Sequence, residues 1–115
     1  MNTTEEQISV KEWKERVLNL CQKPGVSMAE ISRMPNAGGG GNLTSGTCQN
    51  IILWDGIQRN LADAISQLLA DAQIEVRSSS PLIYLIDGAS LRLPIAKQHR
   101  NYKTPHWLPV VINLL

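Results

Sequence analysis

The sequence contains no phenylalanine, and only 4% of its 115 residues are aromatic. Its core must therefore be built from leucine, isoleucine and valine, with the three tryptophans as its largest side chains. An apolar fraction of 43% is typical of a globular chain and not of a disordered one. Because this length fits one domain, we predict a flexible N-terminus over 1–9 and a single domain over 10–115.

Cysteine is scarce as well. Cys21 and Cys48 are too few for a disulfide framework or a cysteine metal site. One bridge is conceivable, but we interpret both residues as free thiols in a reducing compartment. No apolar run approaches the ~20 residues of a membrane span, and no charged-then-apolar leader opens the chain. These absences predict a cytoplasmic protein that does not bind membranes.

Acidic residues are missing from one end of the chain, although the net charge is only +1. After Asp87 there is no acid, while four cations follow: Arg92, Lys97, Arg100 and Lys103. A net charge close to zero gives no long-range electrostatic steering towards nucleic acid. The uneven distribution makes the C-terminal part of the chain the place to look for an anionic partner.

Three segments have the apolar spacing of amphipathic helices. Residues 10–22 place valine, tryptophan and leucine on one stripe, and Pro24 follows their end. Residues 27–33 open with Ser27 and Glu30 in the arrangement of a capping box. Residues 50–72 carry the longest stripe, which predicts one long central helix with Leu61, Ile65 and Leu68 in the core.

A glycine-rich segment, 35–47, separates the short helices from the long one. It contains four consecutive glycines, Gly38–Gly41, which are entropically expensive to order. We interpret the segment as a flexible loop that folding does not require. A backbone cradle for an anion is the alternative. The glycines of 41–47 share the spacing of a phosphate-binding loop, but the lysine of that motif is absent, so the match is rejected.

From Ile74 onwards the pattern favours strands. Residues 74–77 alternate between apolar and polar, and 82–86 form a continuous apolar run before Asp87-Gly88, a hairpin signal. Residues 91–95 alternate as the return strand, and Pro94 places that strand at a sheet edge. A last apolar strand is expected over 107–115, and because it contains Pro109 it either lies at a sheet edge or begins only at Val110. The expected fold class is α+β: a helix pair, a glycine-rich loop, a long helix and a small antiparallel sheet.

This order of elements resembles a winged helix over residues 10–96. ValSerMetAlaGluIleSer (26–32) corresponds to the second helix of a helix-turn-helix, and the long helix with its hairpin corresponds to a recognition helix and wing. The chain differs in its glycine-rich insertion and in the acidic outer face of the long helix, which carries Asp55, Asp63 and Asp71. An acidic face repels phosphate. If the domain contacts nucleic acid, we therefore expect the basic loop after residue 96 to do so.

No local signature of catalysis is present. Candidate nucleophiles and bases are Cys21, Cys48, the serines 78–80, His99 and His106, but the sequence alone does not bring them together. Two histidines seven residues apart also fall short of the three protein ligands that zinc requires. We expect no metal, no cofactor and no enzymatic activity, and we place an uncharacterised enzyme third among the functional hypotheses.

The leading hypothesis is a small non-catalytic accessory or regulatory protein that contacts nucleic acid through the basic loop 97–107. That loop mixes cations with stackable rings, as single-strand binding surfaces do. A protein-assembly module, either a homo-oligomer or a subunit docking on a larger complex, is the alternative, because apolar strands such as 82–86 need cover on both faces. The candidate binding residues are Lys97, His99, Arg100, Tyr102, Lys103 and His106.

Overall fold

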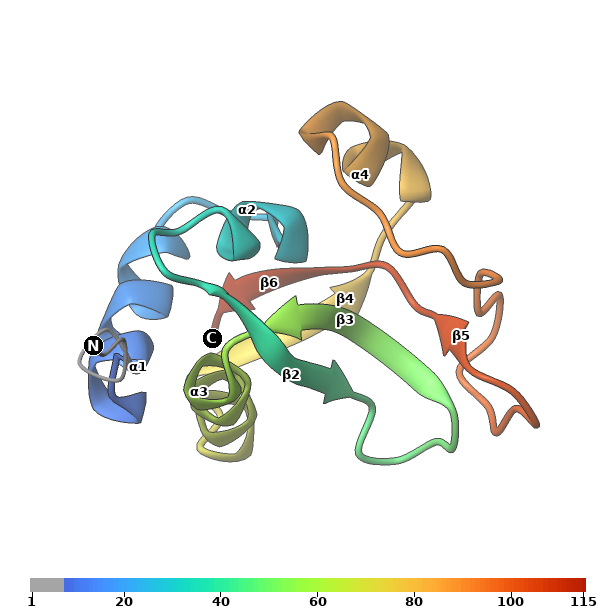
Figure 1. Cartoon of the computed structure of the whole chain (residues 1–115), viewed down its shortest axis with the longest axis horizontal. Helices are drawn as coiled ribbons and strands as arrows, with labels where there is room; N and C mark the ends of the chain where they lie inside the picture. The colour runs from blue at the N-terminus through green and yellow to red at the C-terminus, as the bar shows by residue number, and fades with distance from the viewer. Residues whose placement is uncertain (1–7) are drawn as a thin grey trace.

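A computed structural model describes residues 8–115 and shows an α+β fold, as the sequence predicts. Its described strands form two three-stranded sheets, one in the order β1-β6-β4 and the other in the order β2-β3-β5. Helices α1, α2 and α3 gather at one end of these sheets, whereas α4 projects beyond them (Figure 1).

Both predicted N-terminal helices are confirmed. Helix α1 spans Val10–Leu20, and its N-cap Ser9 accepts a hydrogen bond from the Glu12 backbone N–H. Helix α2 spans Met28–Ser32, and the expected serine, Ser27, accepts a hydrogen bond from the Glu30 backbone N–H at 3.2 Å. The two-residue strand β1, Val26–Ser27, lies between them. The predicted flexible terminus falls mainly outside the described residues, but Ile8 already packs into the core.

The glycine-rich loop prediction is wrong, because Gly38–Thr44 forms strand β2, which pairs antiparallel with β3. A Cβ atom at Gly39 would lie 2.9 Å from the Cα atom of Gln58, and one at Gly41 would lie 2.9 Å from the carbonyl oxygen of Ile57. The absence of side chains therefore lets this strand approach the backbone closely. Glycines that predict flexibility from the sequence serve close packing in the fold.

The long central helix is also corrected. Its first part, Ile51–Ile57, is strand β3, and the helix α3 covers only Arg59–Ala70. Within that shorter helix the predicted core positions Leu61, Ile65 and Leu68 are all fully buried. The apolar spacing therefore indicates a helix correctly after residue 58, whereas before it the same spacing falls within a strand.

The strand predicted over 74–77 is confirmed as β4, Ile74–Ser78. The following hairpin is not formed: Pro81–Asp87 is helix α4, and 91–95 contributes only an isolated bridge from Ile95 to Trp107. Helix α4 begins and ends with residues that commonly cap helices. Ser80 caps its N-terminus through a bond from the Leu82 N–H, and Gly88 ends it with a positive φ of 82°. Without a long helix and a wing, the winged-helix arrangement is not confirmed.

The C-terminal strands connect the two sheets. Strand β5, His106–Trp107, runs parallel to β3 in one sheet, and β6, Val110–Leu114, lies between β1 and β4 in the other. Of the two alternatives for the last strand, the later start is confirmed, because the strand begins at Val110, directly after Pro109. Its central position leaves both of its edges hydrogen-bonded, so it is not an edge strand.

An aromatic cluster occupies the core close to the connection between β5 and β6. Tyr84 of α4 packs edge-on against Trp107, with ring centroids 4.9 Å apart, and Trp54 of β3 lies against both. The Tyr84 hydroxyl donates to the Val110 carbonyl at 2.6 Å and accepts from the Met28 N–H at 2.9 Å. This side chain thereby fixes α4 to the start of α2 and to β6.

Candidate functional site

The basic loop follows the buried Ala96 on the surface and ends in strand β5. Among the residues predicted to bind nucleic acid, Lys97, His99, Arg100 and Lys103 are exposed, and Tyr102 and His106 are half-buried. In the described part of the chain none of the three lysine and arginine side chains of this loop forms an ion pair. Their charges are therefore available to an external anion.

Hydrogen bonds hold this loop against the connection between β2 and β3. The Gln49 N–H donates to Asn101 Oδ1 at 2.8 Å, and Asn50 Nδ2 donates to the Tyr102 carbonyl at 2.9 Å. The backbone N–H groups of Tyr102 and His106 donate in turn to the carbonyls of Gln49 and Asn50. The two segments are about fifty residues apart in sequence, yet they form one ordered surface.

The ring of Tyr102 is engaged within the loop itself. His106 stacks on it with a centroid separation of 4.0 Å, and the Arg100 guanidinium carbon lies 4.7 Å from the ring centroid. The Tyr102 hydroxyl also donates to the Gln98 carbonyl at 2.9 Å. A nucleic-acid base that stacks on Tyr102 would compete with His106 or Arg100 for the ring.

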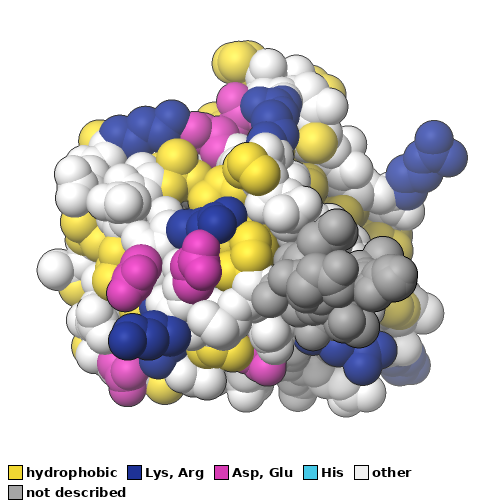
Figure 2. Space-filling view, turned by 60° about the vertical axis from the view of Figure 1, so that its left-hand side comes forward, with side chains coloured by type: hydrophobic (Ala, Val, Ile, Leu, Met, Phe, Trp, Pro, Cys, Tyr) yellow, Lys and Arg dark blue, Asp and Glu magenta, His cyan; other side chains and the backbone are white. Residues whose placement is uncertain are grey.

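Charges are arranged differently on the face that carries the N-terminal helices. Figure 2 shows acidic and basic side chains interspersed over much of that face. Two ion pairs contribute to this mixture, Arg16 with Glu12 at 2.7 Å and Lys23 with Glu30. This mixed face is a poor match for a polyanion.

A cluster of one imidazole and two hydroxyls, which sequence reasoning missed, adjoins the basic loop. Nε2 of His99 lies 3.0 Å from Ser45 Oγ and 3.2 Å from Thr47 Oγ1, and the two hydroxyl oxygens lie 3.2 Å apart. More than fifty residues separate His99 from its partners, so no local motif could have predicted the contact. We call Ser45, Thr47 and His99 the hydroxyl–imidazole cluster.

This cluster borders an apolar pocket of about 320 Å³. The pocket lies between the two sheets and α3, and Thr44, Gly46 and Ser78 also line it. No acidic side chain lines it. Its apolar lining consists of Leu53, Leu69, Val76, Leu108 and Val110.

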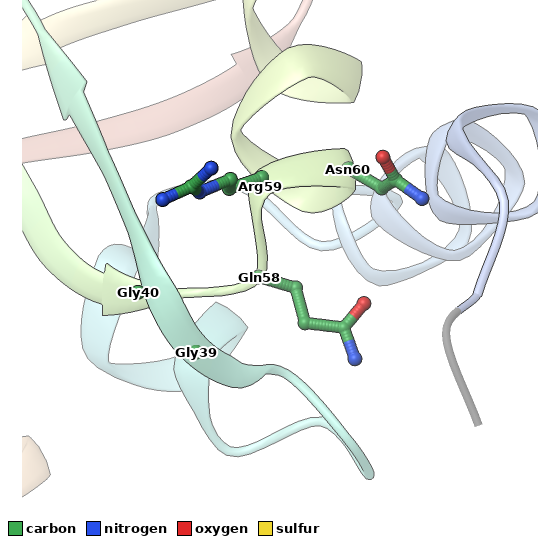
Figure 3. Close-up of a pocket in the computed structure, with 5 residues that line it drawn as sticks. All are labelled: Gly39, Gly40, Gln58, Arg59 and Asn60. Atoms are coloured by element: carbon green, nitrogen blue, oxygen red, sulfur yellow. The ribbon is translucent and has the colours of Figure 1, made fainter. Parts of the chain in front are cut away.

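A second pocket of about 260 Å³ lies where the glycine strand meets the start of α3, lined by Gly39, Gly40, Gln58, Arg59 and Asn60. The three longer side chains point in different directions and do not converge on one point (Figure 3). Two of them have structural partners, since Gln58 accepts from the Trp13 indole N–H and Asn60 donates to the Ile8 carbonyl. Side-chain donors therefore do not converge at this pocket to support the anion-cradle alternative for the glycines.

Burial makes one of the two cysteines a poor nucleophile. Burial, with a smaller contribution from the Glu30 carboxylate, raises the pKa of the Cys21 thiol to about 11, so this residue is protonated at neutral pH. Cys48 is a free, half-buried thiol. Within residues 8–115 no three histidine, cysteine or acidic side chains come together as a metal site.

The His99 cluster lacks the third group that a hydrolytic triad uses to orient its base. In the described residues, His99 forms hydrogen bonds only through Nε2, and none of its partners is a carboxylate. Ser45 and His99 therefore lie within hydrogen-bond distance of each other, and among the described residues no carboxylate is bonded to His99.

Among the described helices, none has the length and apolar character needed to cross a bilayer. No protein-family model, curated protein or solved structure matches the chain.

Proposed function

We propose that this chain is a small non-catalytic accessory or regulatory protein that contacts nucleic acid through the basic loop 97–107. The observation that carries the proposal is the exposure of Lys97, Arg100 and Lys103 without ion-pair partners in the described chain. Phosphate oxygens are the groups that such cations bind. The hydrogen bonds to Gln49 and Asn50 support the same proposal, because an ordered loop loses less entropy on binding.

The experiment is a salt titration with mixed-sequence single- and double-stranded oligonucleotides. Affinity should fall as a power of the salt concentration, and the slope should become shallower by about one unit for each phosphate contact removed. The test variant replaces Lys97, Arg100 and Lys103 with alanine.

A matched control replaces Lys11, Lys14 and Arg59 with alanine, so both variants lose three positive charges. These control residues lie on α1 and at the start of α3, and they too form no ion pair in the described chain. The proposal requires the loop variant to lose affinity and the control to keep most of it. Equal losses would show nonspecific charge attraction, and an absence of wild-type binding at low salt would refute the proposal.

Self-association is a second candidate, favoured by one observation on α4. Leu82, Leu85 and Ile86 recur along one stripe of that helix and are 63%, 68% and 84% exposed. The acid of this helix, Asp87, is engaged by the Ser27 hydroxyl at 2.5 Å. We propose a second copy as the occupant, because two uncharged stripes can meet around a two-fold axis without like-charge repulsion.

Three side chains on a seven-residue helix cover less than the ~800 Å² per partner of a standard interface. We therefore expect a weak, concentration-dependent dimer. Light scattering should give 12.7 kDa at low concentration and a rising mass at higher concentration, with little dependence on salt. Leu85→Glu should keep the protein monomeric, whereas Ser66→Glu, on the exposed side of α3, should not. A wild-type mass that stays monomeric throughout would exclude this candidate.

A further inference from the structure

We infer that the pocket between the two sheets binds a small monocarboxylic acid, with its apolar body inside and its carboxylate on the hydroxyl–imidazole cluster. This inference concerns a different ligand, and its site shares His99 with the proposed nucleic-acid surface. It follows from three observations: the size of the pocket, the apolar side chains that line it beside a polar loop, and the two hydroxyls and the imidazole that meet at that loop.

The size of the pocket limits the ligand. About 320 Å³ lies at the lower end of the range of small-molecule sites. Since one water molecule occupies roughly 30 Å³ in the liquid, the space corresponds to a ligand of about ten non-hydrogen atoms. A carboxylic acid with about eight carbons fits this space.

The lining fixes which end of the ligand enters. Leu53 of β3, Leu69 of α3 and Val76 of β4 supply apolar surface from three different elements, so polar groups of a ligand would be left there without partners. Ser45, Thr47 and His99 lie together at the rim, where a polar head can remain close to solvent. A ligand with one apolar end and one polar end satisfies both environments.

The hydrogen-bonding groups of the cluster match a bound anion better than they match one another. Its three polar atoms lie 3.0–3.2 Å from one another, but each hydroxyl has one hydrogen to donate, and Nε2 of His99 either donates or accepts a single bond. A carboxylate can accept from both hydroxyls and from Nε2–H at the same time. Charge agrees with this choice, because no acid lines the pocket and the exposed Lys97 and Arg100 flank His99 in sequence.

The binding test uses the full chain and octanoate, followed by calorimetry and by amide chemical-shift changes. Octanoate should bind saturably at one site and shift the amide resonances of 44–47 and of His99. Octanol lacks the carboxylate and acetate lacks the body, so each should bind at least tenfold more weakly. A parallel titration with 3-phenylpropionate distinguishes a linear from an aromatic apolar body, and the tighter ligand identifies the class.

Variants locate the site. Ser45→Ala and His99→Ala should each weaken octanoate binding about tenfold, the loss expected for one hydrogen bond to a charged group. Val76→Phe should abolish binding by filling the pocket, and Ser66→Ala should leave it unchanged. Ser45→Ala and Val76→Phe retain every cation of the basic loop, so oligonucleotide affinity should survive in them whichever way the ligand test ends.

The inference fails if octanoate does not bind at 10 mM, a concentration far above the dissociation constant expected for a pocket of this size. It also fails if binding occurs but is insensitive to both Ser45→Ala and Val76→Phe. Thermal denaturation followed by circular dichroism identifies any variant that has lost its fold. Because Ser45 lies in an exposed loop, its variant keeps the test decisive even if Val76→Phe is unstable.

Discussion

At the scale of single residues, Cys21 illustrates how burial determines the chemistry of a side chain. It follows the last turn of α1, and its backbone N–H bonds to the Val17 carbonyl at 2.9 Å. Its side chain is 2% exposed, so an ionised sulfur there would be without water. The apolar stripe of the helix predicted this burial from the sequence, and with it an inert thiol in place of a nucleophile.

The raised pKa of Cys21 predicts a loss of stability in alkali. The folded state binds this proton more tightly than the unfolded chain, whose thiol has a pKa of about 9.0, against about 11 when folded. The contribution is therefore complete below pH 9 and is lost as the pH rises towards 11, on the order of 2 kcal/mol in all. Urea denaturation of the reduced protein between pH 8 and pH 10.5 measures it.

Two cysteine variants separate this effect from general alkaline unfolding. Cys21→Ala should show a clearly smaller loss of stability across that pH range, whereas Cys48→Ala, which retains the buried thiol, should behave as the wild type does. Tyr84 contributes later, because burial raises its pKa to about 12. Identical pH profiles for all three proteins would show that Cys21 ionises as freely in the folded state as in the unfolded one.

The hydroxyl–imidazole cluster marks the limit of residue-level prediction. The sequence identified His99 as a candidate because it lies among cations, and the structure places it at the surface. Its contacts with Ser45 and Thr47 depend on how β3 pairs with β5, which brings the two loops together. Pairing of strands over fifty residues apart leaves no periodic signal in the chain, so neither the partners nor the pocket could be predicted.

At the scale of elements, close packing by glycine explains strand β2. Its register on β3 shifts between Gly38 and Gly41, both of which pair with Ile57. Gly39 and Gly41 touch the backbone at the junction of β3 and α3, while a Cβ at Gly40 would meet nothing within 4 Å. Three neighbouring glycines thus differ sharply in how much space surrounds them.

This difference gives a matched set of substitutions. Gly39→Ala and Gly41→Ala should each destabilise the protein by about 1–3 kcal/mol, because backbone atoms must move to admit the methyl group. Gly40→Ala should fall within about half a kcal/mol of wild type, as an ordinary surface change does. Chemical denaturation measures all three. If the three variants were equally stable, the segment would be a loop, as the sequence analysis expected, and not a packed strand.

The elements that were predicted wrongly share a physical cause. Residues 82–86 were interpreted as a strand because an uninterrupted apolar run is typical of burial on both faces, yet only Tyr84 of α4 is buried. The sequence nevertheless contains the signals of a helix: Ser80 is the N-cap of α4, Pro81 is its first residue, and Gly88 ends it. In 51–57 the error is reversed: the core requires a strand between β2 and β5, although apolar residues also fall at helical spacing.

At the scale of the whole molecule, the two sheets are joined by short covalent and packing links. Only Leu108 and Pro109 separate β5 of one sheet from β6 of the other. Tyr84 bonds to the first residue of β6 while its ring packs on Trp54 and Trp107 of the other sheet. Loss of either sheet would therefore expose the aromatic cluster, and we expect the two sheets to unfold together.

The positions of the tryptophans allow a direct test of this cooperativity. All three lie outside the sheet β1-β6-β4, since Trp13 is in α1, Trp54 in β3 and Trp107 in β5. Ile74→Ala removes a buried side chain from β4 in that sheet, at a cost of about 2–5 kcal/mol. Tryptophan fluorescence and far-ultraviolet circular dichroism should report the same lowered denaturation midpoint, because a single cooperative domain has one transition. A midpoint that falls by circular dichroism but not by fluorescence would mean that the sheets unfold independently, and the chain would then consist of two folding units.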